Sequence, residues 1–121
     1  MLNQRYSEIV NNFDIYTYHI LGCGAIGSAA ATQLVRMGAT NLKLYDMDRV
    51  GTENIGVSMY RLNDIDMHKT KALKMICLSI NKSVIIECID GKFEQYDFDG
   101  KDIVILGFDS MESRLDAVKS I

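Results

Sequence analysis

Three closely spaced glycines between two apolar runs constrain this chain more than any other feature. The apolar run 18–21 leads into Gly22, Gly24 and Gly27, which open a helical pattern, and a second apolar run ends at Asp46. The order is strand, glycine turn, helix and strand, with a carboxylate at the end of the second strand. It predicts a nucleotide-binding βαβ unit.

Each glycine in this turn has its own physical task. Gly22 permits the tight turn, Gly24 lets the backbone approach a phosphate, and Gly27 lets the helix pack against the strand. The amino end of the helix offers unpaired N–H groups and partial positive charge to an anion. Asp46 is then placed to accept hydrogen bonds from ribose hydroxyls. With this context, an ordinary glycine turn is the weaker interpretation.

The composition sets limits on the kind of protein and its partners. A chain of 121 residues that is 48% apolar predicts one domain with a sizeable core. A net charge of −3 does not favour a nucleic-acid partner, which usually requires a basic face. No apolar run approaches the ~20 residues of a membrane span, and no signal-peptide core is present. We therefore expect no membrane partner and a cytoplasmic location. The three cysteines form no CxxC pair, which argues against a zinc site or a disulfide framework.

Hydrophobic periodicity predicts alternating helices and strands along the chain. The expected elements are a helix at 2–13, a strand at 16–21, a helix at 25–37, a strand at 42–45, a helix at 69–80, a strand at 84–89, a short strand or turn at 92–96, a buried strand at 103–106 and a helix at 111–118. The stripe expected to face inward from 25–37 is Ile26, Ala30, Leu34 and Met37. The long segment 47–68 has no sustained period and is expected to be a functional loop with a short helix near 59–62.

This alternation predicts a three-layer, Rossmann-like α/β fold. We expect a mainly parallel sheet in the strand order 3-2-1-4, with helices on both faces. In that order the glycine turn, Asp46 and Asp109 converge at the carboxyl ends of the strands, where such folds bind ligands. The strand at 103–106 has a neighbour on one side only, an apolar edge that soluble proteins seldom leave bare. We expect it to self-associate or to be covered by a further strand of a longer chain.

Two ligands suit this set of residues. One is NAD, which often occupies such a glycine turn. The other is ATP with Mg²⁺, in which Asp109 would hold the metal and a lysine would neutralise phosphate charge. Hydride transfer usually needs a general acid or base, most often histidine. Neither histidine is a good candidate for this general acid or base. His19 is expected to be a core residue with its hydrogen bonds satisfied, and His68 is expected to be exposed.

Four segments of the chain resemble the ThiF/MoeB/HesA superfamily of ubiquitin-activating-enzyme-like adenylyltransferases. They are GCGAIGSAAATQLVRMG, DMDRVGTEN, DIDMHKTKA and ILGFDSMESRL. The family shows a glycine turn, a D-x-D-x-V-x-x-x-N element, a Lys-Ala pair and a D-N-x-x-x-R element in the same order. The similarity extends over about residues 5–116. An NAD enzyme has no reason to carry the second element after its ribose carboxylate.

The resemblance implies a reaction and a role for each polar residue. Asp46 would bind the ATP ribose, Asp48 and Asn54 would shape the nucleotide and phosphate pocket, Lys71 would contact the α-phosphate, Asp109 would hold Mg²⁺, and Arg114 would support the loop of Asp109. The C-terminal carboxylate of a ubiquitin-like or sulfur-carrier protein, typically ending in Gly-Gly, would attack the α-phosphorus. The products would be an acyl-adenylate and pyrophosphate. Because a carboxylate is already ionised, this chemistry depends on charge neutralisation and alignment more than on a base. The family also implies a homodimer.

The chain departs from the family pattern at phosphate-facing positions. After its asparagine the family carries Leu-x-Arg-Gln, whereas residues 55–58 are Ile-Gly-Val-Ser, and Arg61 is the substitute candidate. The family's R-Y-x-R element ends here in Glu8, and its Asp-Asn pair is Asp109–Ser110. Loss of two arginines would weaken transition-state stabilisation by several kcal/mol, by analogy with other charge-stabilising donors.

Three functions therefore stay open on the sequence. The first is an ATP-dependent adenylating domain, the second an NAD-binding oxidoreductase fragment, and the third a catalytically weak nucleotide-binding or dimerisation module. In the first, residues 1–121 are expected to form a single nucleotide-binding domain that is the N-terminal part of a longer adenylation domain.

Overall fold

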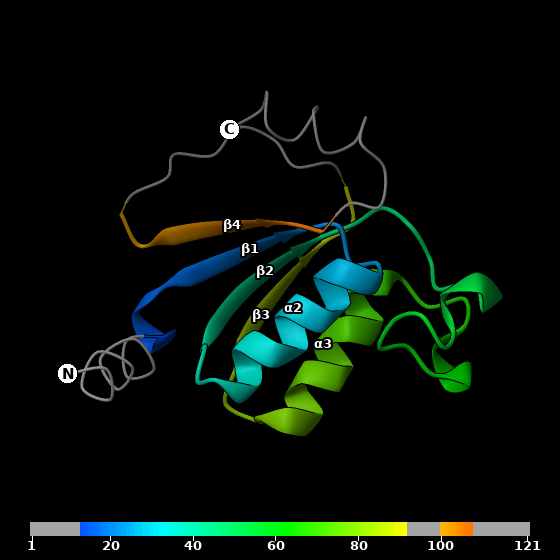
Figure 1. Ribbon diagram of the computed structural model, residues 1–121, viewed down its shortest axis with the longest axis horizontal. Helices are drawn as coiled ribbons and strands as arrows, with labels where there is room; N and C mark the ends of the chain where they lie inside the picture. Colours follow the sequence, from blue (N-terminus) through cyan, green and yellow to red (C-terminus); the bar gives the residue numbers. More distant parts are fainter. Residues whose placement is uncertain (1–12, 92–99, 108–121) are drawn as a thin grey trace.

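The computed structural model describes residues 13–91 and 100–107, and these contain one parallel sheet of four strands (Figure 1). The strands are β1 (Thr17–Leu21), β2 (Asn41–Tyr45), β3 (Ile85–Ile89) and β4 (Asp102–Leu106). Their order in the sheet is β3-β2-β1-β4, and every pairing is parallel. The Rossmann-like fold and the strand order 3-2-1-4 are confirmed.

Two helices cover one face of this sheet, as Figure 1 shows. They are α2 (Ala25–Arg36) and α3 (Lys69–Ile80), and short 3-10 turns lie at η1 (Phe13–Ile15), η2 (Thr52–Asn54) and η3 (Leu62–Asp64). The expected elements at 2–13, 92–96 and 111–118 lie outside the described residues, except for Phe13, which begins η1, so a helical layer on the other face stays a prediction. None of the described helices is long and apolar enough to cross a membrane.

Alternation along the strands separates a large core from a smaller one. On the helix-covered face, Ile20, Leu42 and Leu44 are fully buried and pack with Ala31 and Leu73 of the two helices. On the opposite face, Leu21 and Tyr45 pack with the partly buried Ile89, Val104 and Leu106. The predicted strand at 103–106 is half-buried and not fully buried, because β4 has β1 as its one neighbour within the described sheet.

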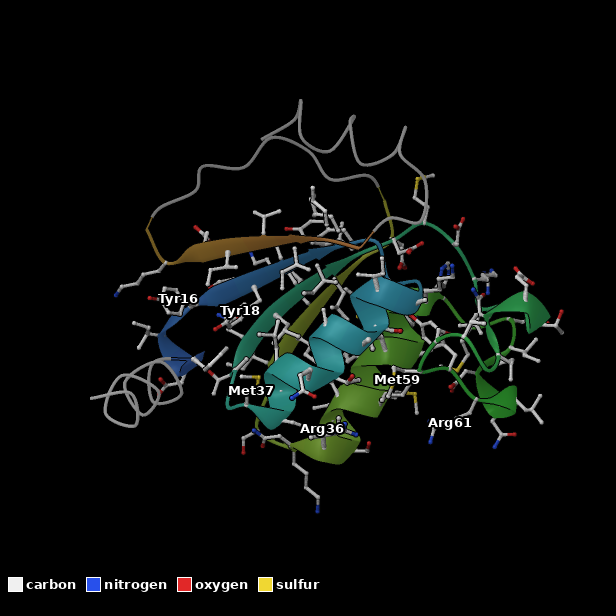
Figure 2. All side chains as sticks on the ribbon, viewed as in Figure 1. Tyr16, Tyr18, Arg36, Met37, Met59 and Arg61 are labelled. Atoms are coloured by element: carbon white, nitrogen blue, oxygen red, sulfur yellow. The ribbon has the colours of Figure 1, made fainter. Side chains whose placement is uncertain are left out.

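The face that α2 turns toward the sheet differs from the expected one. The buried residues are Gly27, Ser28, Ala31, Thr32 and Val35, whereas Ile26 is 48% exposed. The other three members of the expected stripe are half-buried, including Met37 at the carboxyl end of the helix (Figure 2). The helix turns its small residues toward the sheet because they allow a close approach of the two backbones. The expected inward stripe was chosen by hydrophobic size and was wrong, because the buried face lies one residue further along the chain.

The loop between β2 and α3 is held by short-range capping bonds. The expected short helix near 59–62 is instead the 3-10 turn that begins at Leu62, because the buried Asp64 carboxylate accepts a hydrogen bond from the Arg61 N–H at 2.7 Å. That bond starts the turn after Arg61. A second 3-10 turn, Thr52–Asn54, was not expected from the sequence.

Three glycines meet where β1, β4 and α2 come together. Gly22 has a positive φ of 96°, which a residue with a side chain rarely adopts. A Cβ at Gly27 would lie 1.8 Å from the Gly22 carbonyl oxygen, and a Cβ at Gly107 would lie 2.5 Å from the same oxygen. The Gly107 N–H donates to the Leu21 carbonyl at 2.8 Å, which continues the pairing of β4 with β1. The turn is therefore packed backbone against backbone.

Replacement of Gly27 by alanine tests this packing. Because the new methyl group meets backbone and not a flexible side chain, Gly27→Ala is expected to lower the free energy of unfolding by about 1–3 kcal/mol or more. Denaturant unfolding measures it, with Gly91→Ala as the control, since no described atom lies within 4 Å of a Cβ there. Equal stability of the two variants would contradict the close approach.

Candidate functional site

The amino end of α2 opens the candidate site. Its N-cap residue is Gly24, which has no side chain to cap the helix, and the Ser28 N–H donates to the Gly24 carbonyl at 2.9 Å. The N–H groups that come before Ser28 in the first turn of α2 have no acceptor within the helix. A helix end of this kind attracts an anion through both hydrogen bonding and the helix dipole.

Asp46 directly joins the glycine turn to the loop that follows β2. One of its carboxylate oxygens accepts the Cys23 N–H at 2.8 Å, and the other accepts the Asp48 N–H at 2.8 Å. The residue is half-buried, and each carboxylate oxygen retains acceptor capacity beyond one bond. The structure therefore brings Asp46 to the turn as the sequence predicted, and it adds a role in shaping that turn.

Asp48 contributes to the same place through its backbone. Its side chain is exposed, but its carbonyl oxygen accepts the Lys69 N–H at 3.0 Å. This bond ties the first residue of α3 to the loop that Asp46 organises. Asp48 thus positions a helix end next to the glycine turn.

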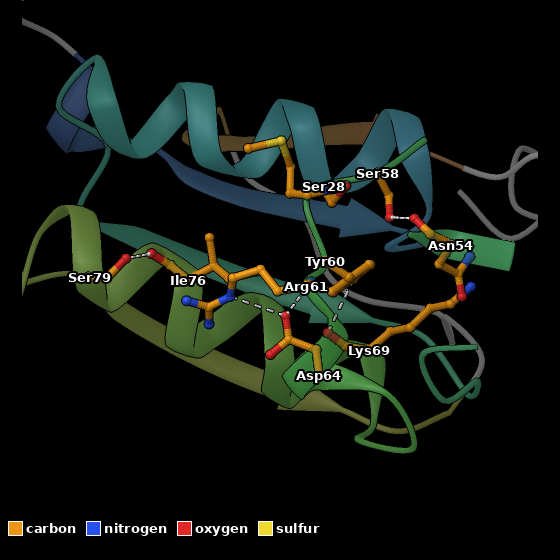
Figure 3. Close-up of polar contacts among 10 residues, drawn as sticks. Ser28, Asn54, Ser58, Tyr60, Arg61, Asp64, Lys69, Ile76 and Ser79 are labelled. Atoms are coloured by element: carbon orange, nitrogen blue, oxygen red, sulfur yellow. Dashed lines mark hydrogen bonds and ion pairs between the residues drawn. The ribbon is translucent and has the colours of Figure 1, made fainter. Parts of the chain in front are cut away.

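Lys69 is the lysine that lies beside this turn. It is buried, with 8% of its surface exposed. Burial raises the pKa of the Cys23 thiol well above its usual value, the Asp46 carboxylate adds to the rise, and Lys69 opposes it. Figure 3 shows the Lys69 side chain directed toward Asn54. A cation thus lies close to the turn and to the Asp46 carboxylate.

Lys71, which the sequence analysis placed on the α-phosphate, is exposed and lies toward β3. Burial raises the pKa of Cys88 in β3, and the charges that oppose this rise are those of Lys74 and Lys71. Two positions apart on a helix, side chains point roughly 200° away from each other, so Lys69 and Lys71 leave α3 in nearly opposite directions. The role of Lys71 at the α-phosphate stays a prediction, and Lys69 is a second candidate that the structure adds.

The loop after Asn54 folds back against α2. The Asn54 side-chain oxygen accepts the Gly51 N–H at 2.8 Å, and the Ser58 N–H donates to the Asn54 carbonyl at 3.2 Å. The next residue, Met59, donates its N–H to Ser28 Oγ of α2 at 3.3 Å. These bonds bring the Asn54 loop to the amino end of α2, as the predicted site requires.

Arg61, the substitute candidate for the missing arginine, points elsewhere. Its Nε lies 3.4 Å from Asp64 Oδ2, and 63% of its side chain is exposed. In Figure 3 the guanidinium lies toward Ile76 of α3, away from Asn54. The described structure therefore offers no arginine at residues 55–61 that faces the glycine turn.

Tyr60 is a part of the site that no sequence motif singles out. It is 3% exposed, and its hydroxyl donates to the Cys23 carbonyl of the glycine turn and lies 3.3 Å from the Lys69 carbonyl. Burial raises the pKa of this hydroxyl, so it stays protonated and able to donate. Figure 3 shows it between the loop and the start of α3.

The remaining candidates lie elsewhere in the chain. Asp109 and Arg114 are outside the described residues, and within 13–91 and 100–107 no three His, Cys, Asp or Glu side chains group as a metal site would need. His19 is fully buried, with hydrogen bonds to the Tyr45 hydroxyl at 3.0 Å and to Asp102 at 2.8 Å, which confirms it as a satisfied core residue. His68, which was expected to be exposed, is instead half-buried, with its Nδ1 3.9 Å from Asp90 Oδ2.

The chain is similar in sequence to ubiquitin-like modifier-activating enzymes. The chain is 35% identical over 82 residues to ubiquitin-like modifier-activating enzyme 5 of Arabidopsis thaliana and 37% identical over 82 residues to that of Oryza sativa. Each match covers 65% of this chain but only 19% and 20% of those proteins, so the chain spans about a fifth of their length.

Solved structures share its fold. Escherichia coli TcdA, a tRNA N6-threonylcarbamoyladenosine dehydratase, superposes with a TM-score of 0.81 at 23% identity, over 92% of this chain and 49% of TcdA. Escherichia coli MccB, solved with ATP, superposes with a TM-score of 0.65 at 24% identity, over 68% of this chain and 25% of MccB.

The family model that matches is that of the ThiF family, and it extends over residues 11–119. It therefore includes the glycine turn, the loop after β2 and both described helices. This chain belongs to the ThiF family.

Proposed function

We propose that this chain is the ATP-binding part of an enzyme that adenylates the C-terminal carboxylate of a ubiquitin-like or sulfur-carrier protein. One observation carries the proposal: the glycine turn, Asp46 and Lys69 lie together at the carboxyl ends of β1 and β2. Support comes from relatives named as ubiquitin-like modifier-activating enzymes, and from MccB and TcdA structures solved with ATP and with AMP.

The geometry suits a nucleotide that lies across the ends of the strands. Its phosphates would meet the N–H groups at the start of α2, and its ribose hydroxyls would donate to Asp46. The Lys69 ammonium would neutralise charge on the α-phosphate, in the role that the sequence alone assigned to Lys71. Such neutralisation matters because a carboxylate nucleophile and a triphosphate repel each other until positive charge lies between them.

The metal and the macromolecular partners belong to the same proposal. Asp109, which follows β4, would hold Mg²⁺ through its carboxylate, the ligand type that this ion prefers. The acceptor would be a small protein with a C-terminal Gly-Gly. MccB has also been solved together with MccA, which supports a polypeptide substrate. The active enzyme would be a homodimer.

A second candidate function rests on the loop after Asn54. Val57 occupies the position of the expected arginine and is 68% exposed, and Arg61 is paired with Asp64. A site with fewer phosphate-facing cations favours a module that binds a nucleotide and turns it over slowly. Binding without turnover would identify this case.

Side-by-side calorimetric titration with ATP–Mg²⁺ and with NAD tests the proposal. We expect binding of ATP–Mg²⁺ alone, and exchange of pyrophosphate into ATP once a carrier protein ending in Gly-Gly is added. Binding of NAD in place of ATP would support an oxidoreductase fragment. Binding of ATP without exchange would support the weak module.

The choice between the two lysines is a direct prediction. Lys69→Ala is expected to weaken ATP binding by about ten- to a hundredfold, because a charged hydrogen bond to phosphate contributes about 1.5–3 kcal/mol. Lys71→Ala is the matched control and should change affinity by less than about threefold, as expected for an exposed side chain. The opposite ranking would return the phosphate role to Lys71.

The ribose role of Asp46 can be separated from its role in the turn. The native chain should bind ATP more tightly than 2′-deoxy-ATP, because the 2′-hydroxyl donates to the carboxylate. Asp46→Ala should bind both weakly and no longer distinguish them. Loss of affinity with the preference for ATP retained would mean that Asp46 acts through the Cys23 and Asp48 N–H groups alone.

A further inference from the structure

The Tyr60 hydroxyl lies between the two parts of the proposed site that carry positive charge. One acceptor, the Cys23 carbonyl, belongs to the glycine turn, and the other, the Lys69 carbonyl, belongs to the first residue of α3. A hydroxyl has one proton, so the bond to Cys23 is the principal one and the contact of 3.3 Å to Lys69 is secondary. The side chain therefore spans from the turn to the lysine's own backbone.

The hydroxyl is not needed merely to fill space in the core. A phenylalanine ring would occupy nearly the same volume at this 3% exposed position without burying a polar atom. A buried hydroxyl costs free energy unless it is hydrogen-bonded, so its presence matters through the bonds that it makes. Both of those bonds end on backbone atoms of the site.

Backbone hydrogen bonds hold the residue that precedes Tyr60 and the first residue of α3. The Met59 N–H bonds to Ser28 of α2, and the Lys69 N–H bonds to the Asp48 carbonyl. Within residues 13–91 and 100–107, Tyr60 is the side chain that contacts both the glycine turn and α3 by hydrogen bonding. Tyr60 therefore links the backbone of the glycine turn to the backbone of the residue that carries the Lys69 ammonium.

We infer that Tyr60 is a positioning residue for the nucleotide phosphates, whose hydroxyl holds the glycine turn and Lys69 at the spacing that phosphate binding needs. The inference rests on the proposed function and deepens it. Residues 55–60, Ile-Gly-Val-Ser-Met-Tyr, contain no arginine. Charge neutralisation from this side of the site then falls on Lys69, and its placement becomes correspondingly important.

Tyr60→Phe tests the inference, with Tyr18→Phe as a matched control. Tyr18 is also a buried tyrosine, 2% exposed, and its hydroxyl donates to the Phe13 carbonyl at 3.1 Å. It lies near the amino end of β1, on the far side of the molecule from Met59 and Arg61 (Figure 2). Each variant loses one hydroxyl that donates to a backbone carbonyl, but only Tyr60→Phe removes one that contacts the site.

The measurement compares affinity for ATP with affinity for adenosine, which has the base and ribose but no phosphates. Titrations of the full chain are made at a temperature where circular dichroism shows all variants folded. Tyr60→Phe should weaken ATP binding roughly three- to tenfold and leave adenosine binding unchanged, in keeping with one hydrogen bond. Tyr18→Phe should change neither affinity.

Other outcomes separate this inference from the proposed function. A native chain that binds no ATP would overturn the proposed function itself. If the native chain binds ATP, equal losses for ATP and adenosine, no loss at all, or failure of Tyr60→Phe to fold would each show that the hydroxyl serves the fold generally. Any of these would overturn the positioning role.

Discussion

The carboxylate of Asp46 is the interaction on which the rest of this site depends. It accepts one N–H from the glycine turn and one from the loop after β2, so two segments far apart in the chain share one acceptor. The loop then holds the first residue of α3 through the Asp48 carbonyl. A single charged group thereby connects the turn, the loop and the second helix. Hydrogen bonds to a charged acceptor are stronger than neutral ones, which suits this central position.

Much of the fold follows from local sequence. The glycine turn and the apolar strands predict the βαβ unit and the order 3-2-1-4, because right-handed crossovers leave few alternatives. The helix at 69–80 is confirmed at both ends. The orientation of α2 was not predictable from hydrophobicity, since the contact with Gly22 selects small residues. Choosing Ile26 as an inward residue overlooked that spatial requirement.

Site residues that directly follow a strand could be predicted from the sequence. Site residues in the loop between β2 and α3 were harder to predict. Asp46 comes directly after β2, so parallel topology alone brings it to the turn. The assignment of the α-phosphate contact to Lys71 came from the family resemblance and stays a prediction, whereas the buried position of Lys69 beside Cys23 is visible only in the folded chain. Tyr60 carries no motif, and its role depends on two backbone carbonyls that only the folded chain brings together.

The contact of Gly107 with the glycine turn has a consequence for how this sequence can vary. A Cβ at position 107 would lie 2.7 Å from Gly27 Cα, so the end of β4 forms one wall of the turn. A Cβ at either Gly27 or Gly107 would also meet the same Gly22 carbonyl oxygen, although the two glycines are far apart in the chain. A side chain at either position can therefore be accommodated only if the backbone of the turn moves, whether or not a ligand is bound there.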